Sequence, residues 1–337
     1  MKPKLKPLSE QVIVITGASS GIGLATAEGA VRAGARVVLV SRNEEALAEI
    51  EQRLDHRGDR VIHVVADVAN REDLERVAAD TLYRFGGFDT WINNAGVSVW
   101  GRLDQVDEQD HRRVMETNFW GTFYGSIIAM AHLRGKGGAI INIGSVESET
   151  PLPFHASYSA SKHAIKALTD TLRIELRGSA AHVSVTLVRP SSTDTQFIDH
   201  SKNELSSAPT LPPPVYAPEI VAEAILDAAE NSQRDVYVGN ARTLTNLSRH
   251  TPRLLDWLQS NVIYNWIMSG RRDRNPRGTF NRRASDRWHE ELRTRGRYPG
   301  PTVPYSPATQ MRQHPVATSA IVAAAAIATY ALLRRRR

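Results

Sequence analysis

The chain has 337 residues, of which 41% are hydrophobic and 23% are charged, which suffices for one large α/β domain and additional segments. Because the chain lacks cysteine, disulfides, cysteine nucleophiles and thiolate metal sites are excluded, and a reducing compartment is expected. The net charge of +6 belongs to the C-terminal third, where arginines crowd after Arg271 with no nucleic-acid recognition fold beside them, so no nucleic-acid partner is expected.

The N-terminal arm contains no apolar run of signal-peptide length before Val12, so we expect the main domain to stay in the cytosol. Beyond it, short apolar segments alternate with helical patterns. Strands are predicted at residues 12–15, 36–40, 61–65, 89–92, 139–143, 183–188 and 236–238. Strands that are apolar throughout are buried on both faces, and helices between them imply parallel pairing. Residues 1–240 are therefore predicted to form an α/β domain, a Rossmann-type doubly wound parallel sheet.

A glycine-rich turn links the first strand to the first helix. Its sequence is Thr16-Gly17-Ala18-Ser19-Ser20-Gly21-Ile22-Gly23. Gly17 permits the tight turn, Gly21 lets the backbone approach a pyrophosphate, and Gly23 lets the helix pack closely on the sheet. Free N–H groups and the helix dipole favour an anion at this point. The predicted dinucleotide contacts here are Gly17, Ser19, Ser20, Gly21, Ile22 and Gly23.

The end of the second strand indicates which dinucleotide is used. NAD sites usually place an acidic residue there, whereas this chain has Ser41 and Arg42. A carboxylate would repel a 2′-phosphate, and Arg42 can bind one, so NADP(H) is predicted; the alternative is that Arg42 is a solvated residue at a helix start. Asp67, after the third strand, is predicted either to accept a hydrogen bond from the adenine amino group or to cap the next helix.

Tyr158 and Lys162 lie four residues apart at the start of a predicted helix, and therefore on one helical face. We expect the Lys162 charge to lower the pKa of the Tyr158 hydroxyl, which would make the phenol an acid or base near neutral pH. Ser145 follows the fifth strand, at the same carboxyl edge of the sheet, where its hydroxyl can polarise a carbonyl. The same spacing is also common in solvated Tyr–Lys pairs.

The order of the motifs is more specific than any one of them. The chain contains TGASSGIG from Thr16, the run Asn93-Asn94-Ala95-Gly96, then Asn118, Ser145 and YSASK from Tyr158. In this order and spacing, residues 9–240 resemble the short-chain dehydrogenase/reductase family. The resemblance implies a Rossmann fold, a nicotinamide cofactor and, by likeness, a dimer or tetramer.

The resemblance also implies roles for individual residues. Tyr158 would donate or remove the proton, while Lys162 would hold the ribose hydroxyls and tune Tyr158. Ser145 would orient the substrate oxygen, and Asn118 would hold a water that links Lys162 to solvent. Asn94, in the segment that shapes the cofactor cleft, would be a cofactor contact.

The chain departs from the family pattern after the sixth strand. Where relatives often have Pro-Gly followed by a threonine that touches the nicotinamide carboxamide, this chain reads Pro190-Ser191-Ser192-Thr193-Asp194-Thr195. Pro190 and Thr193 are the predicted cofactor contacts, with Thr195 the alternative to Thr193. Ser191 lacks the backbone freedom of glycine, so a different loop geometry is expected.

The sequence indicates the substrate less clearly than the cofactor. Apolar residues beside the motifs are predicted to line a substrate pocket, or else to be ordinary core residues. They are Val97, Val99, Trp100, Leu152 and Phe154. Residues 199–217 are polar and proline-rich and leave the carboxyl end of the sixth strand, so they are predicted to form a mobile lid over the substrate, the alternative being a plain surface loop.

The family pattern ends near Gly239, and three further segments follow. Residues 241–270 have apolar residues at helical spacing, which favours a helical extension that packs on the main domain or lies at a membrane interface. Residues 271–315, rich in arginine, proline and glycine, are predicted to be a solvated linker that an anionic lipid surface would attract.

The last segment, residues 316–337, consists of an uncharged apolar run to Leu333 and four arginines. The run is at the short limit for a transmembrane helix. A C-terminal membrane anchor is predicted, the alternative being an amphiphilic surface or oligomerisation helix, and the positive-inside rule gives no orientation because both flanks are basic.

Together these features predict an NADP(H)-dependent oxidoreductase with a cytoplasmic catalytic domain held at a membrane. It would transfer a hydride between the nicotinamide and a carbonyl or secondary alcohol of an apolar substrate. Two alternatives remain open: a non-catalytic NADP(H)-binding membrane scaffold, and an NAD(H)-dependent alcohol dehydrogenase.

Overall fold

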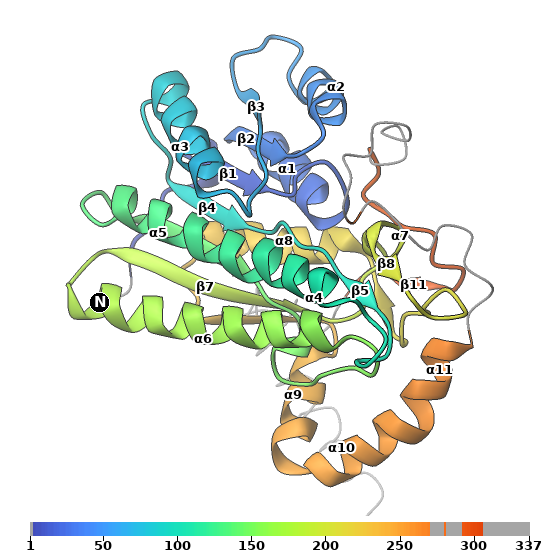
Figure 1. The fold of residues 1–337 in the computed structure, drawn as a ribbon. Coiled ribbons are helices and arrows are strands. Elements are labelled where there is room, and N and C mark those ends of the chain that lie inside the picture. Colours follow the sequence, from blue (N-terminus) through green and yellow to red (C-terminus); the bar gives the residue numbers. More distant parts are fainter. Residues whose placement is uncertain (1–2, 270–279, 281–291, 306–337) are drawn as a thin grey trace, which may run out of the picture.

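A computed structural model describes residues 3–269, 280 and 292–305. Its centre is a sheet of seven strands, all paired in parallel, in the order β10-β7-β6-β4-β1-β2-β3 (Figure 1). The strands are β1 (Val12–Thr16), β2 (Arg36–Ser41), β3 (Val61–Val65), β4 (Thr90–Asn93), β6 (Gly138–Ile143), β7 (Val183–Pro190) and β10 (Asp235–Val238). The predicted doubly wound parallel sheet is therefore confirmed, with each strand within two residues of its expected bounds.

Helices cover both faces of this sheet (Figure 1). One face carries α1 (Gly21–Arg32), α2 (Glu44–Leu54) and α8 (Pro218–Glu230), and the other carries α3 (Arg71–Phe85), α5 (Gly121–Leu133) and α6 (Ala156–Gly178). Each layer of helices has its own apolar core. Leu24, Leu47 and Ile220 belong to the first core, while Leu74 and Leu172 belong to the second. These two cores hold the carboxyl ends of the strands at one edge.

Several elements add to the predicted pattern. Helix α4 (Glu108–Met115), a π-helical turn (Glu116–Trp120) and α5 fill the stretch between β4 and β6. Two short pairs of strands, β5 (Val99–Trp100) with β8 (Lys202–Asn203) and β9 (Val215–Tyr216) with β11 (Thr302–Val303), lie outside the main sheet. Through β8 and β9 the predicted lid is joined to the rest of the domain at both of its ends.

Residues 241–269 form the expected helical extension, which projects from one side of the domain (Figure 1). It comprises α9 (Ala241–His250), α10 (Pro252–Leu258), a π-helical turn (Gln259–Ile263) and α11 (Tyr264–Met268). The apolar stripe is divided, because Leu255 and Ile267 are buried whereas Leu254, Trp257 and Trp266 are exposed. The extension therefore packs on the domain and still presents apolar side chains outwards.

The predicted linker and anchor lie mostly outside the described residues: of residues 271–337, only Phe280 and residues 292–305 are described. In the part of the chain that is described, no helix combines the length and the apolar character needed to cross a bilayer. The predicted anchor at 316–337 falls entirely beyond it.

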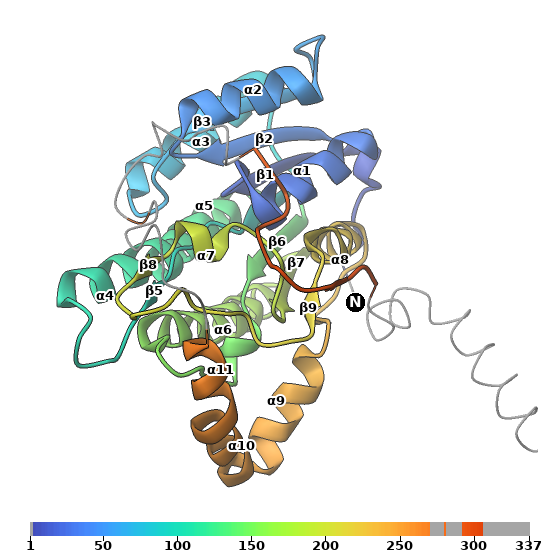
Figure 2. The same cartoon turned by 90° about the vertical axis from the view of Figure 1, so that its right-hand side faces the viewer.

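Residues 292–305, here called the C-terminal strap, return to the main domain. Figure 2 shows the strap, in orange-red, running from beside α1 to β9. The Gly21 N–H donates to the Arg293 carbonyl at 3.0 Å, and the Ala217 N–H donates to the Val303 carbonyl at 3.1 Å. Between these points, the Tyr298 N–H donates to the Asp194 carboxylate at 3.2 Å. The strap thus connects the glycine turn with the loop after β7.

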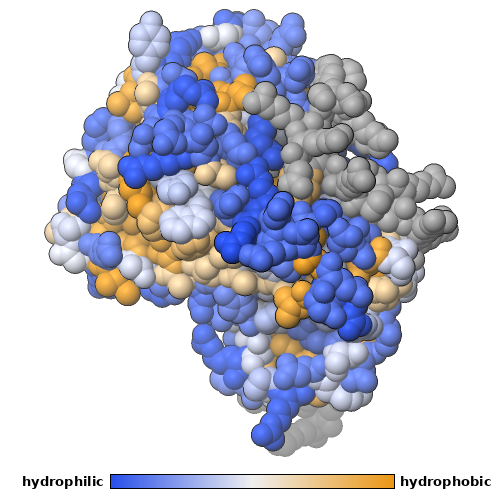
Figure 3. Space-filling view, in the orientation of Figure 1, coloured by the Kyte–Doolittle hydropathy of each residue, from blue (hydrophilic) through white to orange (hydrophobic). Residues whose placement is uncertain are grey.

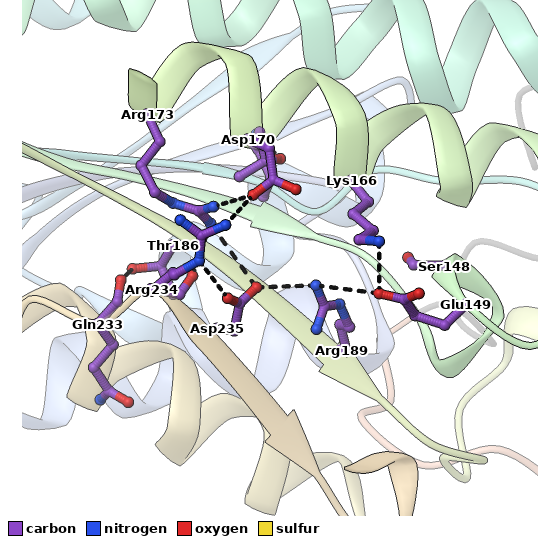
Figure 4. A network of polar contacts seen from close by, with 12 residues as sticks. Ser148, Glu149, Lys166, Asp170, Arg173, Thr186, Arg189, Gln233, Arg234 and Asp235 are labelled. Atoms are coloured by element: carbon purple, nitrogen blue, oxygen red, sulfur yellow. Dashed lines mark hydrogen bonds and ion pairs between the residues drawn. The ribbon is translucent and has the colours of Figure 1, made fainter. Parts of the chain in front are cut away.

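A network of charged side chains ties the edge strand β10 to β7 and α6 (Figure 4). Arg189 on β7 is 3% exposed and donates to Asp235 on β10 at 2.9 Å. Figure 4 continues the chain of contacts from Arg189 to Glu149 and Lys166 on one side. Because Arg189 is buried, its carboxylate partner is needed to offset the cost of removing its charge from water.

Candidate active site

One cleft runs along the carboxyl edge of the sheet, from the end of β2 to the predicted lid. Most predicted site residues line it. They are Gly17, Ser19, Ser20, Gly21, Ile22, Arg42, Asp67, Asn94, Ser145, Tyr158, Lys162, Pro190 and Thr193. Gly23 and Asn118 lie behind the lining. Residues from the first and last thirds of the domain thus meet in one site, as an open α/β sheet requires.

The glycine turn has the tight geometry that its sequence predicts. Gly17 has a φ of +67°, which favours glycine, and a Cβ added to Gly23 would lie 2.1 Å from the Gly17 carbonyl oxygen. The Asn94 side chain donates to the carbonyls of Thr16 and Gly17 at 2.9 and 3.1 Å. Asn94 therefore braces the turn directly. A backbone this free of side chains is a cradle that fits a pyrophosphate.

One donor of the cradle is used by the chain itself. The Gly21 N–H donates to the Arg293 carbonyl of the C-terminal strap. Gly21 still lines the cleft, and the approach of its backbone to a pyrophosphate stays a prediction. Ser19, Ser20 and Ile22 keep their positions in the cleft wall.

The end of β2 is strongly cationic. Arg42 lines the cleft, and Arg113 of α4 donates to the Asp67 carboxylate at 2.6 Å. Burial raises the pKa of Asp67, but the Arg113 hydrogen bond, the Ala69 backbone N–H and the charges of Arg113 and Arg42 outweigh it, so the pKa lies below its ordinary value. The helix-cap alternative for Asp67 is wrong, since Asn70 caps α3. An anionic group bound here would lie near Arg42, and the neighbouring Asp67 carboxylate would repel it less because Asp67 is paired with Arg113.

Tyr158, Ser145 and Lys162 lie together at the inner end of the cleft. The Ser145 side chain lies close to the Tyr158 hydroxyl and lowers its pKa. The Lys162 Nζ lies 5.4 Å from the centroid of the Tyr158 ring and donates to the Ile143 carbonyl at 2.8 Å. Both partners are buried, Ser145 at 8% and Lys162 at 3% exposed. The register of α6 thus brings the phenol and the ammonium group to one face, as their spacing predicts.

The expected electrostatic effect of Lys162 is not the dominant one. Burial and the Glu147 carboxylate raise the pKa of Tyr158 above its ordinary value, and only the Ser145 hydrogen bond lowers it. Burial also lowers the pKa of Lys162 to about 8, against the opposing effect of Glu147. The prediction that Lys162 lowers the Tyr158 pKa is therefore corrected: burial, and after it the Glu147 carboxylate that the sequence argument lacked, raise that pKa.

Asn118 lies in the π-helical turn Glu116–Trp120, a distortion frequent at functional sites. Its side chain is fully engaged: it accepts from the Val97 N–H at 2.8 Å and donates to the Val97 carbonyl and to the Ser161 hydroxyl, both at 3.0 Å. Asn118 therefore holds the loop after β4 against α6. The water link to Lys162 stays a prediction.

Sequence reasoning missed a second polar group beside Tyr158. His155 and Glu147 line the cleft, and the His155 Nδ1 lies 3.0 Å from the Glu147 carboxylate. The His155 Nε2 faces the Ser98 hydroxyl, and the imidazole stacks on the Tyr158 ring at 4.4 Å between centroids. No motif marks these residues, because their contacts join separate segments. The only available signal was their proximity in sequence to Ser145 and Tyr158.

The substrate end of the cleft is largely apolar. Phe197, Ile198, Leu211 and Pro212, from α7 (Phe197–His200) and the predicted lid, form part of its wall. Of the predicted pocket residues, Val97, Trp100 and Leu152 line the cleft. Val99 and Phe154 do not. Val99 belongs to a small core cluster, and the Phe154 ring packs on Tyr264 of α11.

The departure from the family pattern after β7 has a structural counterpart. The Ser191 hydroxyl hydrogen-bonds to the Asn240 side chain, and its N–H donates to the Val238 carbonyl at 3.2 Å. A glycine could not make the side-chain contact. Thr193 donates to the Ser191 carbonyl at 2.8 Å, and Thr195 lies against Gly21. Both threonines line the cleft, so the choice between them stays open.

Comparison with known proteins gives a consistent result. The family model described as short chain dehydrogenase matches residues 11–205. The chain is 40% identical to the uncharacterized oxidoreductase YxnA of Bacillus subtilis over 336 residues, which cover 96% of this chain and 90% of the relative. It is 34% identical over 240 residues to 11-beta-hydroxysteroid dehydrogenase A of Sesamum indicum, with 67% of each chain covered.

Solved structures share the fold. A short chain dehydrogenase from Burkholderia cenocepacia in complex with NADP is 30% identical, with a TM-score of 0.64 over 75% of this chain and 98% of that one. A short chain dehydrogenase/reductase from Burkholderia phymatum in complex with NAD is 26% identical, with a TM-score of 0.67 over 74% and 96%. The motifs, the parallel sheet, the joined Tyr–Lys–Ser group and these matches agree, and the chain belongs to the short-chain dehydrogenase/reductase family of oxidoreductases.

Proposed function

We propose that the protein is an NADP(H)-dependent oxidoreductase that interconverts a carbonyl group and a secondary alcohol on an apolar substrate. One observation carries the proposal: Tyr158 and Ser145 line the cleft together, where its polar and apolar parts meet. A proton donor and a hydroxyl that polarises oxygen are the two groups that carbonyl reduction needs from the protein.

In this mechanism the nicotinamide cofactor supplies the hydride, and the protein handles the proton and the oxygen atom. Ser145 donates to the substrate oxygen and orients it towards Tyr158. During reduction Tyr158 gives its hydroxyl proton to that oxygen, and during oxidation the phenolate takes the proton back. Buried Lys162, next to Gly96 in the cleft wall, would hold the ribose hydroxyls and stabilise the phenolate that reduction leaves.

The proposed preference for NADP(H) rests on charge. Ser41 and Arg42 stand where an NAD site carries an acid, and Arg113 adds a second guanidinium close by. Asp67 does not reverse this, because its charge is paired with Arg113. One similar solved protein is in complex with NADP and another with NAD, so the likeness alone leaves the preference open.

The proposed substrate is an apolar ketone or alcohol larger than a simple alkanol. The cleft wall near Tyr158 also contains Phe197, Leu152 and Leu211, and burial of apolar surface there supplies affinity. Several similar plant proteins are named 11-beta-hydroxysteroid dehydrogenase, which makes rigid polycyclic ketones the first class to test. YxnA, similar over nearly the full chain, carries no substrate in its name.

We propose two further associations for the protein. Figure 3 shows apolar residues gathered over α5 and α6. Ile174 of α6 is 70% exposed, and Trp120, in the π-helical turn before α5, is 42% exposed, so these elements suit contact with a second copy of the chain. The exposed apolar residues of α10 and α11, with the predicted anchor at 316–337, suit attachment to a membrane whose cytoplasmic side holds the catalytic domain.

The decisive test of the activity is Tyr158→Phe. We expect the variant to lose turnover by about 10³-fold or more, because no other hydroxyl can deliver the proton, while NADPH binds nearly as before. The measurements are NADPH oxidation with a panel of apolar ketones and NADPH titration by fluorescence. Retained turnover would overturn the mechanism. Tight NADPH binding by the native protein with no turnover on any ketone or alcohol would favour the non-catalytic scaffold instead.

A further inference from the structure

The buried group beside Tyr158 is a continuous chain of hydrogen bonds. The Glu147 carboxylate accepts hydrogen bonds from the His155 Nδ1 at 3.0 and 3.1 Å and from the Ser159 hydroxyl at 2.6 Å. The His155 Nε2 lies 2.5 Å from the Ser98 hydroxyl. All four residues are buried. With Nδ1 donating to the carboxylate, Nε2 is left to accept from Ser98, which fixes the tautomer of the imidazole.

These contacts follow the order of a hydrolytic serine–histidine–acid triad, but access excludes that chemistry. The Ser98 side chain is fully buried, and Ser98 is not among the residues that line the cleft. No acyl group can therefore reach its hydroxyl. His155 and Glu147 do line the cleft. The role of these hydrogen bonds is therefore to be sought at Tyr158, and Ser98 is not a nucleophile.

The imidazole is the middle ring of a stack. On one side the Trp100 ring lies 3.8 Å away at an angle of 14°, and on the other the Tyr158 ring lies 4.4 Å away at 20°. Phe197 meets the Tyr158 ring at 5.3 Å and 57°. A ring held by Glu147 and Ser98 cannot turn, and a phenol stacked on it is restrained as well.

We propose that Glu147 and His155 are positioning residues for Tyr158: Glu147 fixes the imidazole, and the imidazole fixes the phenol in line with Ser145. The inference rests on the proposed function, in which Tyr158 transfers the proton. It also assigns Glu147 a second effect, because a buried carboxylate near the phenol favours its protonated form.

The other groups that face Tyr158 do not remove this effect. From its own helix α6 come Lys162 and the N-cap His155, and from the 3-10 turn Val146–Ser148 comes Glu147. From α7 comes the uncharged Phe197, with His200 also in the cleft wall. Burial and Glu147 raise the pKa of Tyr158, with Glu147 as the one charged side chain that does so. Removing the carboxylate charge should therefore lower that pKa.

The test places 3,5-difluorotyrosine at position 158 of the full chain and follows its ¹⁹F resonance against pH, since fluorine brings the phenol into a range that can be titrated. Glu147→Gln, nearly isosteric, should move the midpoint down by about one pH unit. Ser98→Ala, at the far end of the chain of hydrogen bonds, should leave it in place. An unchanged midpoint in Glu147→Gln, or an equal shift in Ser98→Ala, would overturn the proposal.

A second variant tests positioning without relying on the charge. His155→Gln can still reach Glu147 but removes the ring stacked on Tyr158. We expect its ¹⁹F resonance to broaden or split, and kcat for ketone reduction to fall about tenfold or more with little change in KM. A single sharp resonance at the native position would count against the inference. If the resonances behave as expected but the native protein reduces no carbonyl, the proposed function fails and the positioning stands.

Discussion

At the scale of single residues, the site depends on how buried charges are paired. Tyr158 and Lys162 were expected from their spacing to form an acid–base pair in which lysine controls the phenol. The structure adds Glu147, whose carboxylate raises the pKa of Tyr158 and opposes the loss of charge on Lys162. The phenol is therefore protonated at neutral pH, as an ordinary tyrosine is.

The cofactor preference is tested at Arg42. Arg42→Asp should weaken NADPH binding on the order of 100-fold, because a charge-assisted contact to the 2′-phosphate is replaced by repulsion, and should leave NADH binding unchanged or improved. Arg57→Asp makes the same change of charge at an exposed position outside the cleft and serves as control. Fluorescence titration with both nucleotides measures the effect. Equal losses for NADPH and NADH would refute the assignment.

At the scale of elements, the sequence patterns located the strands but missed the contacts between segments that are distant in the sequence. The seven strands were predictable because they contain short apolar runs such as Val12-Ile13-Val14-Ile15. Helix α5 was not, since its sequence GTFYGSIIAMAHL lacks a polar face and so shows no helical period. The Tyr158–Lys162 pair follows from local spacing, whereas the contact of His155 with Ser98 depends on packing between α6 and the loop after β4.

The charged network in Figure 4 gives a test of stability at this scale. Asp235→Asn should lower the free energy of unfolding by on the order of 3 kcal/mol, because it removes the nearer of the two carboxylates beside the buried Arg189 and leaves only Glu149, at 3.8 Å. Arg234→Gln is the matched control: Arg234 is 64% exposed, so breaking its contact with Asp235 should cost less than about 1 kcal/mol. Urea denaturation of the full chain measures both. Equal losses would show that Arg189 does not depend on Asp235.

At the scale of the whole molecule, the chain divides into a catalytic α/β body and an extension that presents apolar side chains outwards. The exposed fractions are 54% for Leu254, 59% for Trp257 and 40% for Trp266. Packing of the extension on the domain was predictable, because its apolar residues recur at helical spacing. Leu255 and Ile267 are the residues that are buried. Which half faces the domain depends on contacts such as that of Phe154 with Tyr264.

Membrane attachment through this surface is testable with the full chain. Replacing Leu254 and Trp257 together by serine should reduce co-sedimentation with vesicles of anionic phospholipid at least severalfold, because both lose apolar area that would be buried at the interface. Replacing Leu82 and Tyr83, exposed on α3, by serine removes similar area elsewhere and is the control. Binding that falls equally in both double variants would show that the surface of α10 has no special role.

The C-terminal strap has a consequence for how the protein is made. Gly21 belongs to the first turn of the fold, yet its N–H donates to the Arg293 carbonyl, and the Ala217 N–H likewise donates to the Val303 carbonyl. On the ribosome the nucleotide-binding half emerges first, and these partners leave the exit tunnel only after all seven strands of the sheet have been made. The nascent domain must therefore persist with an incomplete phosphate turn until the C-terminal strap has emerged. Its final architecture is reached only when the strap folds back onto the first turn.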